Sequence, residues 1–189
     1  MTDSLAALRS PAAWLRFLLT AVIGLAIDQI TKVYAFAKLT TAGTIDSQGH
    51  YRPESREYVF IQNWIHFRVT SNYGAVFGLG QGWRHAFVVV SLAAIVFVIY
   101  LFATSGRQRI YQIVLGMLVA GVLGNLYDRM TLGYVRDMVY ALPKWGYFPW
   151  IFNVADSLLC TGVAAMILYS FFHSPPKSRR TESKEPAST

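Results

Sequence analysis

Residues 86–104 read AFVVVSLAAIVFVIYLFAT, an apolar run that contains no charged side chain. A helix of about 20 such residues spans the roughly 30 Å of hydrocarbon in a bilayer. Three further runs of suitable length are Phe17–Ala37, Ile110–Tyr127 and Ile151–Phe172. Of the 189 residues, 54% are hydrophobic and 14% are charged, and the mean hydropathy is +0.36, which is too apolar for an ordinary soluble domain. The sequence therefore predicts an all-α integral membrane protein with four transmembrane helices.

The basic residues favour an orientation with both chain termini in the cytoplasm. An even number of helices puts both ends on one side, and the short turn Gly106–Arg109 carries two arginines on that side. The polar segment 174–189 adds a basic cluster, formed by Lys177, Arg179, Arg180 and Lys184. This segment lacks the apolar surface needed to fold, so we expect a disordered cytoplasmic tail. The net charge of +7 thus reflects membrane topology, and no nucleic-acid partner is expected.

The first apolar run is interpreted as a retained helix rather than as a cleaved secretory signal. No short-side-chain cleavage site follows it, and the run continues past Asp28 and Lys32 to Phe36. The single cysteine, Cys160, lies inside the fourth run, which excludes an intramolecular disulfide and a cysteine metal cluster. The sequence also contains no Gly-rich phosphate loop and no His-Glu-x-x-His zinc motif. Neither a metal nor a cofactor is expected.

Residues 38–85 form the largest segment outside the predicted helices. Its first part, Thr40–Glu57, is polar, whereas Tyr58–Ile61 and Ile65–Val69 have the alternating pattern of strands. We therefore expect a small extracytoplasmic β-sheet in this region, within a single membrane domain that covers residues 1–173.

A loop rich in aromatic side chains, Leu142–Trp150, is expected to complete a cap over the outer face, because amphipathic rings prefer the headgroup layer. The cap also contains glycines that would give it freedom to move, at Gly74, Gly78, Gly80 and Gly82.

Two aspartates stand at the ends of apolar runs, Asp137 after the third run and Asp156 near the start of the fourth. An ionisable group at the edge of the hydrocarbon costs roughly a few kcal/mol, so it normally faces a bundle interior or a water-filled cavity and has a function. The alternating segment Tyr134–Tyr140 would turn Asp137 inward. Asn153 and Asp156 are spaced i, i+3 and so share one helix face. Antiparallel third and fourth helices would bring both acids to the same outer level, which indicates acid/base chemistry.

Polar residues on the first and third helices are placed to support these acids. Asp28 and Lys32 are spaced i, i+4 in the favourable order, which predicts a neutralised pair that holds the bundle together. On the third helix a small-residue face ends in Asp128, with Gly116, Ala120 and Gly124 before it. Asn125 and Arg129 lie beside this face. Two alternatives stay open for Asp128, a structural pair with Arg129 or across helices, and contact with a substrate.

These motifs resemble those of lipoprotein signal peptidase, or signal peptidase II, the bacterial inner-membrane aspartic protease family. The similarity runs across the whole membrane core in the same order and spacing. Five stretches carry it, namely Asp28-Gln-Ile-Thr-Lys32, Asn72-Tyr-Gly-Ala-Val-Phe77, Gly124-Asn-Leu-Tyr-Asp-Arg129, Gly133-Tyr-Val-Arg-Asp137 and Phe152-Asn-Val-Ala-Asp156. Two departures, Val76 where alanine is common and Met138 where phenylalanine is common, change packing more than chemistry. The Thr40–Glu57 stretch is longer than in many members.

The resemblance implies that Asp137 and Asp156 are catalytic. It implies that other polar side chains line the site (Asn72, Asn125, Arg129 and Asn153), with Asp28, Lys32 and Asp128 in support. The implied substrate is a prolipoprotein whose lipobox cysteine carries diacylglycerol, cut immediately before that cysteine. The implied enzyme is multi-pass in the bacterial inner membrane, in contact with membrane lipids, with its site toward the outer face. A monomer is expected, because one chain supplies both aspartates.

A rival hypothesis is a small proton-coupled transporter in which four aspartates form a relay, Asp28, Asp128, Asp137 and Asp156. The sequence disfavours it, because a relay needs acids at successive membrane depths and these four crowd toward the outer ends. There is also no inverted repeat or broken-helix pair. A third hypothesis, a structural membrane scaffold, would leave the polar cluster without a reason.

Overall fold

The structure is a computed structural model that describes residues 5–74, 80, 82–145 and 151–172. The predictions for Val76, Gly78, the 146–150 part of the aromatic loop and the tail lie outside these residues. The described chain contains four helices long and apolar enough to cross a membrane. They are α1 (Pro11–Leu39), α2 (Arg84–Ala103), α3 (Arg109–Thr131) and α4 (Val154–Phe172). The four predicted helices are therefore confirmed.

Two helix boundaries differ from the prediction for local reasons. α1 begins six residues earlier than Phe17, because Pro11 can occupy the first helical position and the Ser10 hydroxyl accepts a hydrogen bond from the Ala13 N–H at 3.2 Å. α4 begins at Val154, because Ile151 and Phe152 form a short strand instead of a first helical turn. Apolar content alone does not distinguish a buried strand from a helix.

Helix α3 is the centre of the bundle and packs against the other three helices. Glycines allow this close approach. A Cβ atom at Gly116 would lie 2.6 Å from the Phe17 carbonyl oxygen of α1, and one at Gly121 would lie 2.6 Å from the Ala155 carbonyl oxygen of α4. The small-residue face predicted on this helix is thus the surface that receives α1.

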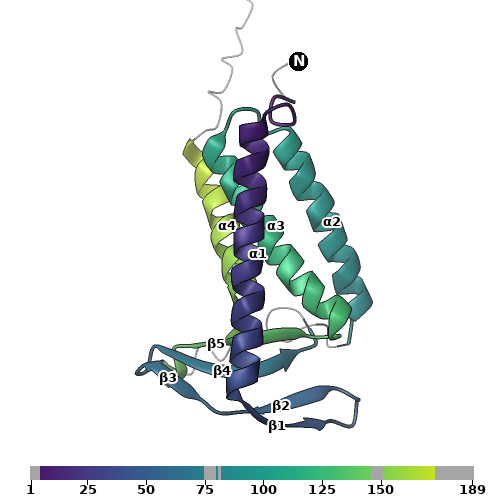
Figure 1. The fold of residues 1–189 in the computed structure, drawn as a ribbon, viewed down its shortest axis with the longest axis vertical. Helices are drawn as coiled ribbons and strands as arrows, with labels where there is room; N and C mark the ends of the chain where they lie inside the picture. The colour runs from purple at the N-terminus through teal and green to yellow at the C-terminus, as the bar shows by residue number, and fades with distance from the viewer. Residues whose placement is uncertain (1–4, 75–79, 81, 146–150, 173–189) are drawn as a thin grey trace, which may run out of the picture.

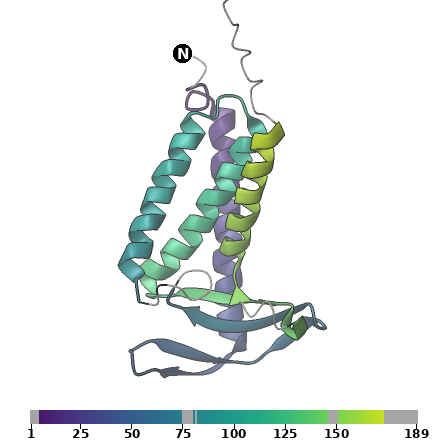
Figure 2. The same ribbon diagram turned by 180° about the vertical axis from the view of Figure 1, so that it is seen from behind.

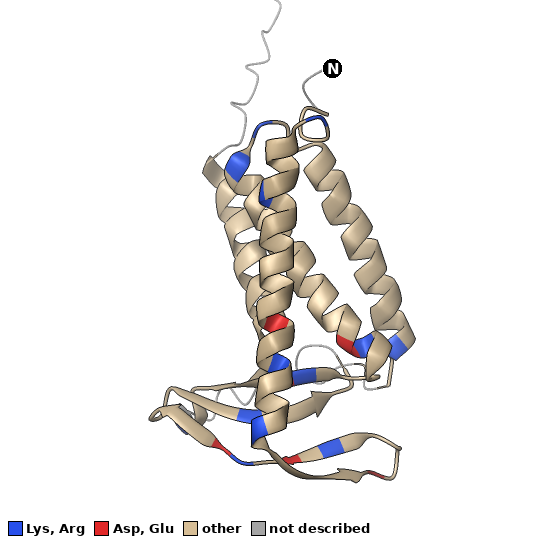
Figure 3. Ribbon diagram, viewed as in Figure 1, with Lys and Arg blue, Asp and Glu red and all other residues tan. Residues whose placement is uncertain are grey.

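The outer walls of the bundle are apolar. On α2, for example, Val96 and Phe97 expose 68% and 57% of their surface, whereas only Val98 and Phe102 are buried. Figure 3 shows charged residues mainly at the two ends of the bundle and in the strands, with few along the helices between them. This distribution suits helices that are surrounded by lipid.

Two antiparallel sheets lie at the end of the bundle opposite the N-terminus (Figure 1). One is a hairpin of β1 (Thr40–Ile45) and β2 (Tyr51–Ser55). The other has the order β3-β4-β5-β6, with β3 at Tyr58–Ile61, β4 at Ile65–Asn72, β5 at Val135–Ala141 and β6 at Ile151–Phe152. The view from behind shows the same sheets beneath the ends of α3 and α4 (Figure 2). The strands predicted near 58–61, 65–69 and 134–140 are confirmed, and the fold is mostly helical.

The β1–β2 hairpin is the main difference from the predicted fold, which treated Thr40–Glu57 only as a polar stretch. β1 has five exposed residues out of six, so it shows no alternation between buried and exposed side chains. It continues directly from α1 and pairs with β2, which in turn packs on β4. The pairing depends on tertiary contacts, which a hydrophobic pattern does not reveal.

Candidate active site

The structure brings Asp137 and Asp156 to one place, where Asn153 contacts both. Asp137 lies on β5 with 1% of its surface exposed, and Asp156 is in the first turn of α4. The side-chain amide of Asn153 donates a hydrogen bond to Oδ1 of Asp137 at 2.6 Å. The backbone N–H of Asn153 donates to Oδ2 of Asp156 at 3.2 Å. A single residue thus connects two carboxylates that are 19 positions apart in the sequence.

Asn153 and Asp156 also form the cap of α4. The N–H of Asp156 donates to Oδ1 of Asn153 at 2.9 Å, while the Asp156 carboxylate accepts from the Asn153 N–H. This reciprocal pattern is a capping box, in which each side chain satisfies a backbone N–H that the helix leaves free. It also holds Asp156 at the positive end of the helix dipole, which favours a negative charge.

Two further asparagines donate to the acids. Asn72 at the end of β4 donates from Nδ2 to Oδ2 of Asp137 at 3.1 Å, and its own oxygen accepts from the Gly74 N–H at 2.9 Å. Asn125 on α3 donates from Nδ2 to Oδ1 of Asp156 at 2.7 Å. β4 and β5 are paired with Thr70 opposite Asp137 and Asn72 opposite Val135, which places the Asn72 side chain beside the acid.

Lys32 occupies the centre of a buried ion cluster behind the acids. Its Nζ lies 2.8 Å from Oδ2 of Asp28 and 3.2 Å from Oδ2 of Asp128, and all three side chains have no exposed surface. The ammonium also donates to Oδ1 of Asn125 at 3.1 Å. The Asp28–Lys32 pair expected from the i, i+4 spacing is therefore present. Asp28 additionally accepts a hydrogen bond from the Ala155 N–H at 2.8 Å, so it helps to cap α4.

Asp128 pairs across elements, as the cross-helix form of the structural alternative predicts, and its ion pairs among the described residues do not include Arg129. Its partners are Lys32 and Arg136, whose Nη2 lies 2.6 Å from Oδ1 of Asp128. Adjacent residues on a helix point about 100° apart and do not face each other. Arg129 instead donates to the Gly74 carbonyl at 3.0 Å, and its guanidinium lies 5.0 Å from the centroid of the Phe87 ring.

Two members of the cluster were not identified from the sequence, Arg136 and Gln29. Arg136 donates to Gln29 Oε1 at 2.7 Å, and the Gln29 amide donates to Asp28 at 3.0 Å and to the Gly124 carbonyl at 3.2 Å. Alternation along β5 places Arg136 on the face opposite Asp137. The signal that was missed is that β5 is buried on both faces, with Arg136 only 8% exposed.

Burial and, after it, the negative charge of Asp156 raise the pKa of Asp137 to about 8, against the lowering effect of the two amide hydrogen bonds from Asn72 and Asn153. A carboxyl with this pKa holds a proton at neutral pH. The arrangement therefore places one protonated acid close to a second carboxyl group at a helix N-terminus, and two such groups can serve as a paired acid and base.

The sequence and fold match known proteins along most of the chain. The family model described as signal peptidase (SPase) II matches residues 20–172. The chain belongs to the signal peptidase II family. A lipoprotein signal peptidase of Psychromonas ingrahamii is 35% identical over 169 residues, which cover 86% of this chain and 88% of that protein. One of Clostridium novyi is 34% identical over 149 residues, covering 78% and 92%.

A solved bacterial membrane enzyme has a similar structure, with a TM-score of 0.67 and 27% identity over 89% of this chain and 93% of that one. Membership in the signal peptidase II family makes the protein a protease, and the four apolar helices make it a multi-pass membrane protein. The region matched by the signal peptidase II model contains both aspartates and every candidate supporting residue.

Proposed function

We propose that this protein is an aspartic endopeptidase that removes the signal peptide from diacylglyceryl-modified prolipoproteins, cutting immediately before the lipidated cysteine. The observation that carries the proposal is the contact of Asn153 with both carboxylates, at 2.6 Å to Asp137 and 3.2 Å to Asp156. Membership in the signal peptidase II family supplies the class of substrate.

In the proposed mechanism Asp137 begins protonated and Asp156 begins ionised. Asp156 takes a proton from a water molecule as the water oxygen attacks the scissile carbonyl carbon, and Asp137 gives its proton to the carbonyl oxygen. The tetrahedral diol then collapses. The C–N bond breaks, Asp156 passes its proton to the leaving nitrogen, and Asp137 recovers a proton from the diol. Both acids return to their starting states without a covalent intermediate.

The charges around the acids favour one shared proton. Lys32 and Arg136 neutralise Asp28 and Asp128 through direct ion pairs. Arg129 is the third cation near the catalytic acids. Lys32 also acts on both acids, but its charge is already balanced by the two supporting aspartates. Two carboxylates against one guanidinium leave a surplus negative charge, which one proton removes, and a buried site disfavours any uncompensated charge.

The same residues provide donors for the substrate. Asn72 and Arg129 both contact the backbone of Gly74. Their side chains are candidates for holding substrate backbone carbonyls or the developing oxyanion. One well-placed donor of this kind contributes roughly 3 kcal/mol to transition-state stabilisation.

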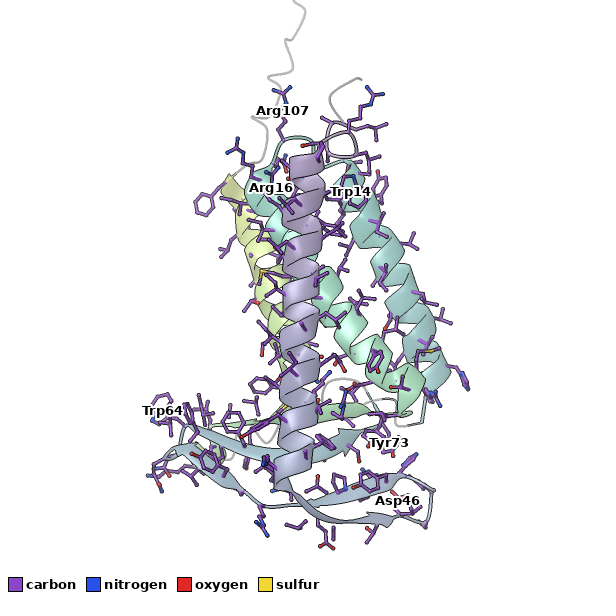
Figure 4. The ribbon with its side chains drawn as sticks, in the orientation of Figure 1. Trp14, Arg16, Asp46, Trp64, Tyr73 and Arg107 are labelled. Carbon is purple, nitrogen blue, oxygen red and sulfur yellow. The ribbon has the colours of Figure 1, made fainter. Side chains whose placement is uncertain are left out.

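The proposed orientation places the sheets and the acids at the outer face of the bacterial inner membrane and both termini in the cytoplasm. Figure 4 shows Arg16 and Arg107 at the bundle end away from the sheets, as the positive-inside rule requires. A signal-peptide helix and two acyl chains partition into lipid at roughly 0.8 kcal/mol per buried CH₂, so acids at headgroup level would meet this substrate. In a Cys160→Ser protein, the added substitution Gln48→Cys should give a thiol that reacts with an impermeant reagent from outside, and Arg107→Cys should not.

The competing transporter hypothesis requires the aspartates to act as a proton relay. Asp28 and Asp128 have no exposed surface and are held in ion pairs with Lys32, so neither is free to pass protons. We further propose that one chain is sufficient, because the contacts between the two catalytic acids are all made within it.

The test is cleavage of a diacylglyceryl-modified precursor by the purified protein in detergent. The wild type should cut the lipidated precursor and leave the unlipidated one intact, while Asp137→Asn and Asp156→Asn should both be inactive. Glu54→Gln, a change at an exposed acid on β2, is the matched control and should cut normally. Cleavage by both Asn variants would refute the catalytic assignment, and aspartate-dependent proton flux without cleavage would favour the transporter.

A further inference from the structure

Tyr73 lies between two residues whose hydrogen bonds belong to the candidate site. Asn72 on one side donates to Asp137, and the Gly74 carbonyl on the other side accepts from Arg129. The strand β4 ends at Asn72, so the pairing with β5 does not extend to Tyr73 or Gly74. The Tyr73 carbonyl accepts a hydrogen bond from the Gly82 N–H at 3.4 Å, and the remaining contacts of Tyr73 are made by its side chain.

Those contacts come from the β1–β2 hairpin. The Tyr73 ring stacks on His50 with centroids 3.9 Å apart and planes 19° from parallel. The Tyr73 hydroxyl accepts a hydrogen bond from the Tyr51 N–H at 2.7 Å. The guanidinium of Arg52 lies 5.6 Å from the ring centroid, within the range of a cation–π interaction. Three consecutive residues at the start of the returning strand thus hold one side chain. On its other side the ring faces Tyr134, 5.4 Å away.

The carboxylate of Asp46 fixes the turn that presents these residues. Oδ1 accepts hydrogen bonds from the N–H groups of Gln48 and His50 at 2.9 and 2.8 Å, and Oδ2 accepts from Nε of Arg52 at 2.9 Å. The hydrogen bond from the His50 backbone is the main cause that keeps the pKa of Asp46 below its ordinary value. Gly49 completes the turn with a φ of 78°, which a glycine adopts without strain.

The hairpin is also joined to β4 directly before Tyr73. Ser71 donates from its hydroxyl to the Tyr51 carbonyl, and the Val69 N–H donates to the Ser55 hydroxyl at 2.8 Å. Figure 4 shows Tyr73 between the bundle and the hairpin that carries Asp46. The hairpin therefore contacts the strand that ends in Asn72 and the residue that follows it.

We propose that Tyr73 is a positioning residue, and that the β1–β2 hairpin, organised by Asp46, holds it so that the Asn72 amide meets Asp137 and the Gly74 carbonyl meets Arg129. This inference rests on the proposed function, since it assigns the hairpin a role in the same site. The hairpin acts on catalysis through Asn72 and does not itself contact the reacting acids.

The first test is a double-mutant cycle on cleavage of the lipidated precursor. Tyr73→Ala should lower kcat by about tenfold to a hundredfold with little change in KM, because misplacement of a catalytic group by about 1 Å has effects of this size. Asn72→Ala should lower kcat as well, and the loss in the double variant should be clearly smaller than the product of the two single losses. Fold-losses that multiply would overturn the proposal, because they would mean that the two residues act independently.

The pH profile separates positioning from a structural role. The Asn72 hydrogen bond lowers the pKa of Asp137, so releasing it should move the alkaline limit of activity to higher pH. Tyr73→Ala and Asn72→Ala should show the same direction of shift. A Tyr73→Ala protein that loses kcat with an unshifted profile would count against the proposal.

A variant outside the candidate site tests whether the loss of activity comes from misfolding. Asp46→Ala releases the turn without touching Asn72, and it should reproduce the loss in kcat, while Glu54→Ala on the same hairpin should not. Hydrogen exchange of the amides at positions 72–74 gives a readout independent of activity. It should become faster in Asp46→Ala and stay unchanged in Glu54→Ala. If the wild type cuts no lipidated precursor, the proposed function fails, and unchanged exchange would then separately refute the positioning role.

Discussion

The raised pKa of Asp137 predicts an unusual dependence of stability on pH. In the folded protein this carboxyl keeps its proton up to about pH 8, whereas in the unfolded chain it releases it near the ordinary value of 3.8. Between these limits the folded state binds more protons, so stability must fall as the pH rises, by about 1.4 kcal/mol per pH unit. From pH 5 to pH 8 the loss reaches up to about 4 kcal/mol, and it is smaller where Asp156 takes part of the shared charge.

The substitution Asp137→Asn removes this dependence, because an amide does not ionise. We expect the variant to gain stability relative to the wild type as the pH rises from 5 to 8, with a relative increase in Tm of about 10 °C at about 2–4 °C per kcal/mol. Unfolding in detergent can be followed by the fluorescence of the five tryptophans. The difference between the two proteins cancels the titrating groups that do not interact with Asp137, and Asp156 is the group that remains in it.

Asp46→Asn is the matched control, because the pKa of Asp46 is lowered instead of raised. The stability that such a group contributes is present above its unfolded pKa and is lost only in acid. The difference in Tm between Asp46→Asn and the wild type should therefore stay constant between pH 5 and 8. A constant difference in Tm between wild type and Asp137→Asn across this range would refute the assignment of the shared proton to Asp137.

Three further predictions concern the supporting residues. Asn153→Ala should lower stability by about 1 kcal/mol and kcat by at least about tenfold. Asn153→Ser should restore stability but not kcat, because a serine caps a helix but has no amide to donate to Asp137. Measuring Tm and kcat on the same samples checks this. Lys32→Met should destabilise the protein by about 3–5 kcal/mol in a chemical unfolding assay, because it leaves two buried carboxylates without their shared cation. Gly124→Ala should lower Tm and kcat, because its new Cβ would overlap the Asp28 carboxylate, whereas Gly116→Ala should lower Tm without changing kcat of the folded fraction.

The membrane helices could be predicted because a bilayer imposes both length and composition on a spanning segment. The ends of these helices depend on single contacts. Ile151 and Phe152 looked like the start of α4, yet they pair with β5, and the Asn153 cap fixes the true start. The β1–β2 hairpin escaped prediction for a related reason, since its stability depends on Asp46 and on contacts with Tyr73 that come from distant sequence.

The sequence predicted which residues gather in the candidate site better than it predicted which of them form ion pairs with each other. The i, i+4 spacing of Asp28 and Lys32 led to the correct ion pair, because helical neighbours at this spacing must face each other. The partner of Asp128 could not be found in this way. Arg136 lies eight residues later on a strand, beyond the turn that ends α3, and only the three-dimensional arrangement brings it to the carboxylate.

The buried cluster has a further consequence for the catalytic acids, which concerns the direction of the amide groups. An asparagine can present either its oxygen or its nitrogen to a neighbour, and only the nitrogen stabilises a carboxylate. Lys32 donates to the oxygen of Asn125, so the nitrogen of that amide must face Asp156.

The other two amides are fixed in the same way by backbone N–H groups, of Gly74 for Asn72 and of Asp156 for Asn153. Each oxygen is occupied by a donor that cannot become an acceptor, so none of the three amides can flip without losing a hydrogen bond. The acids therefore meet preorganised donors before any substrate arrives, and this is the property that electrostatic catalysis requires.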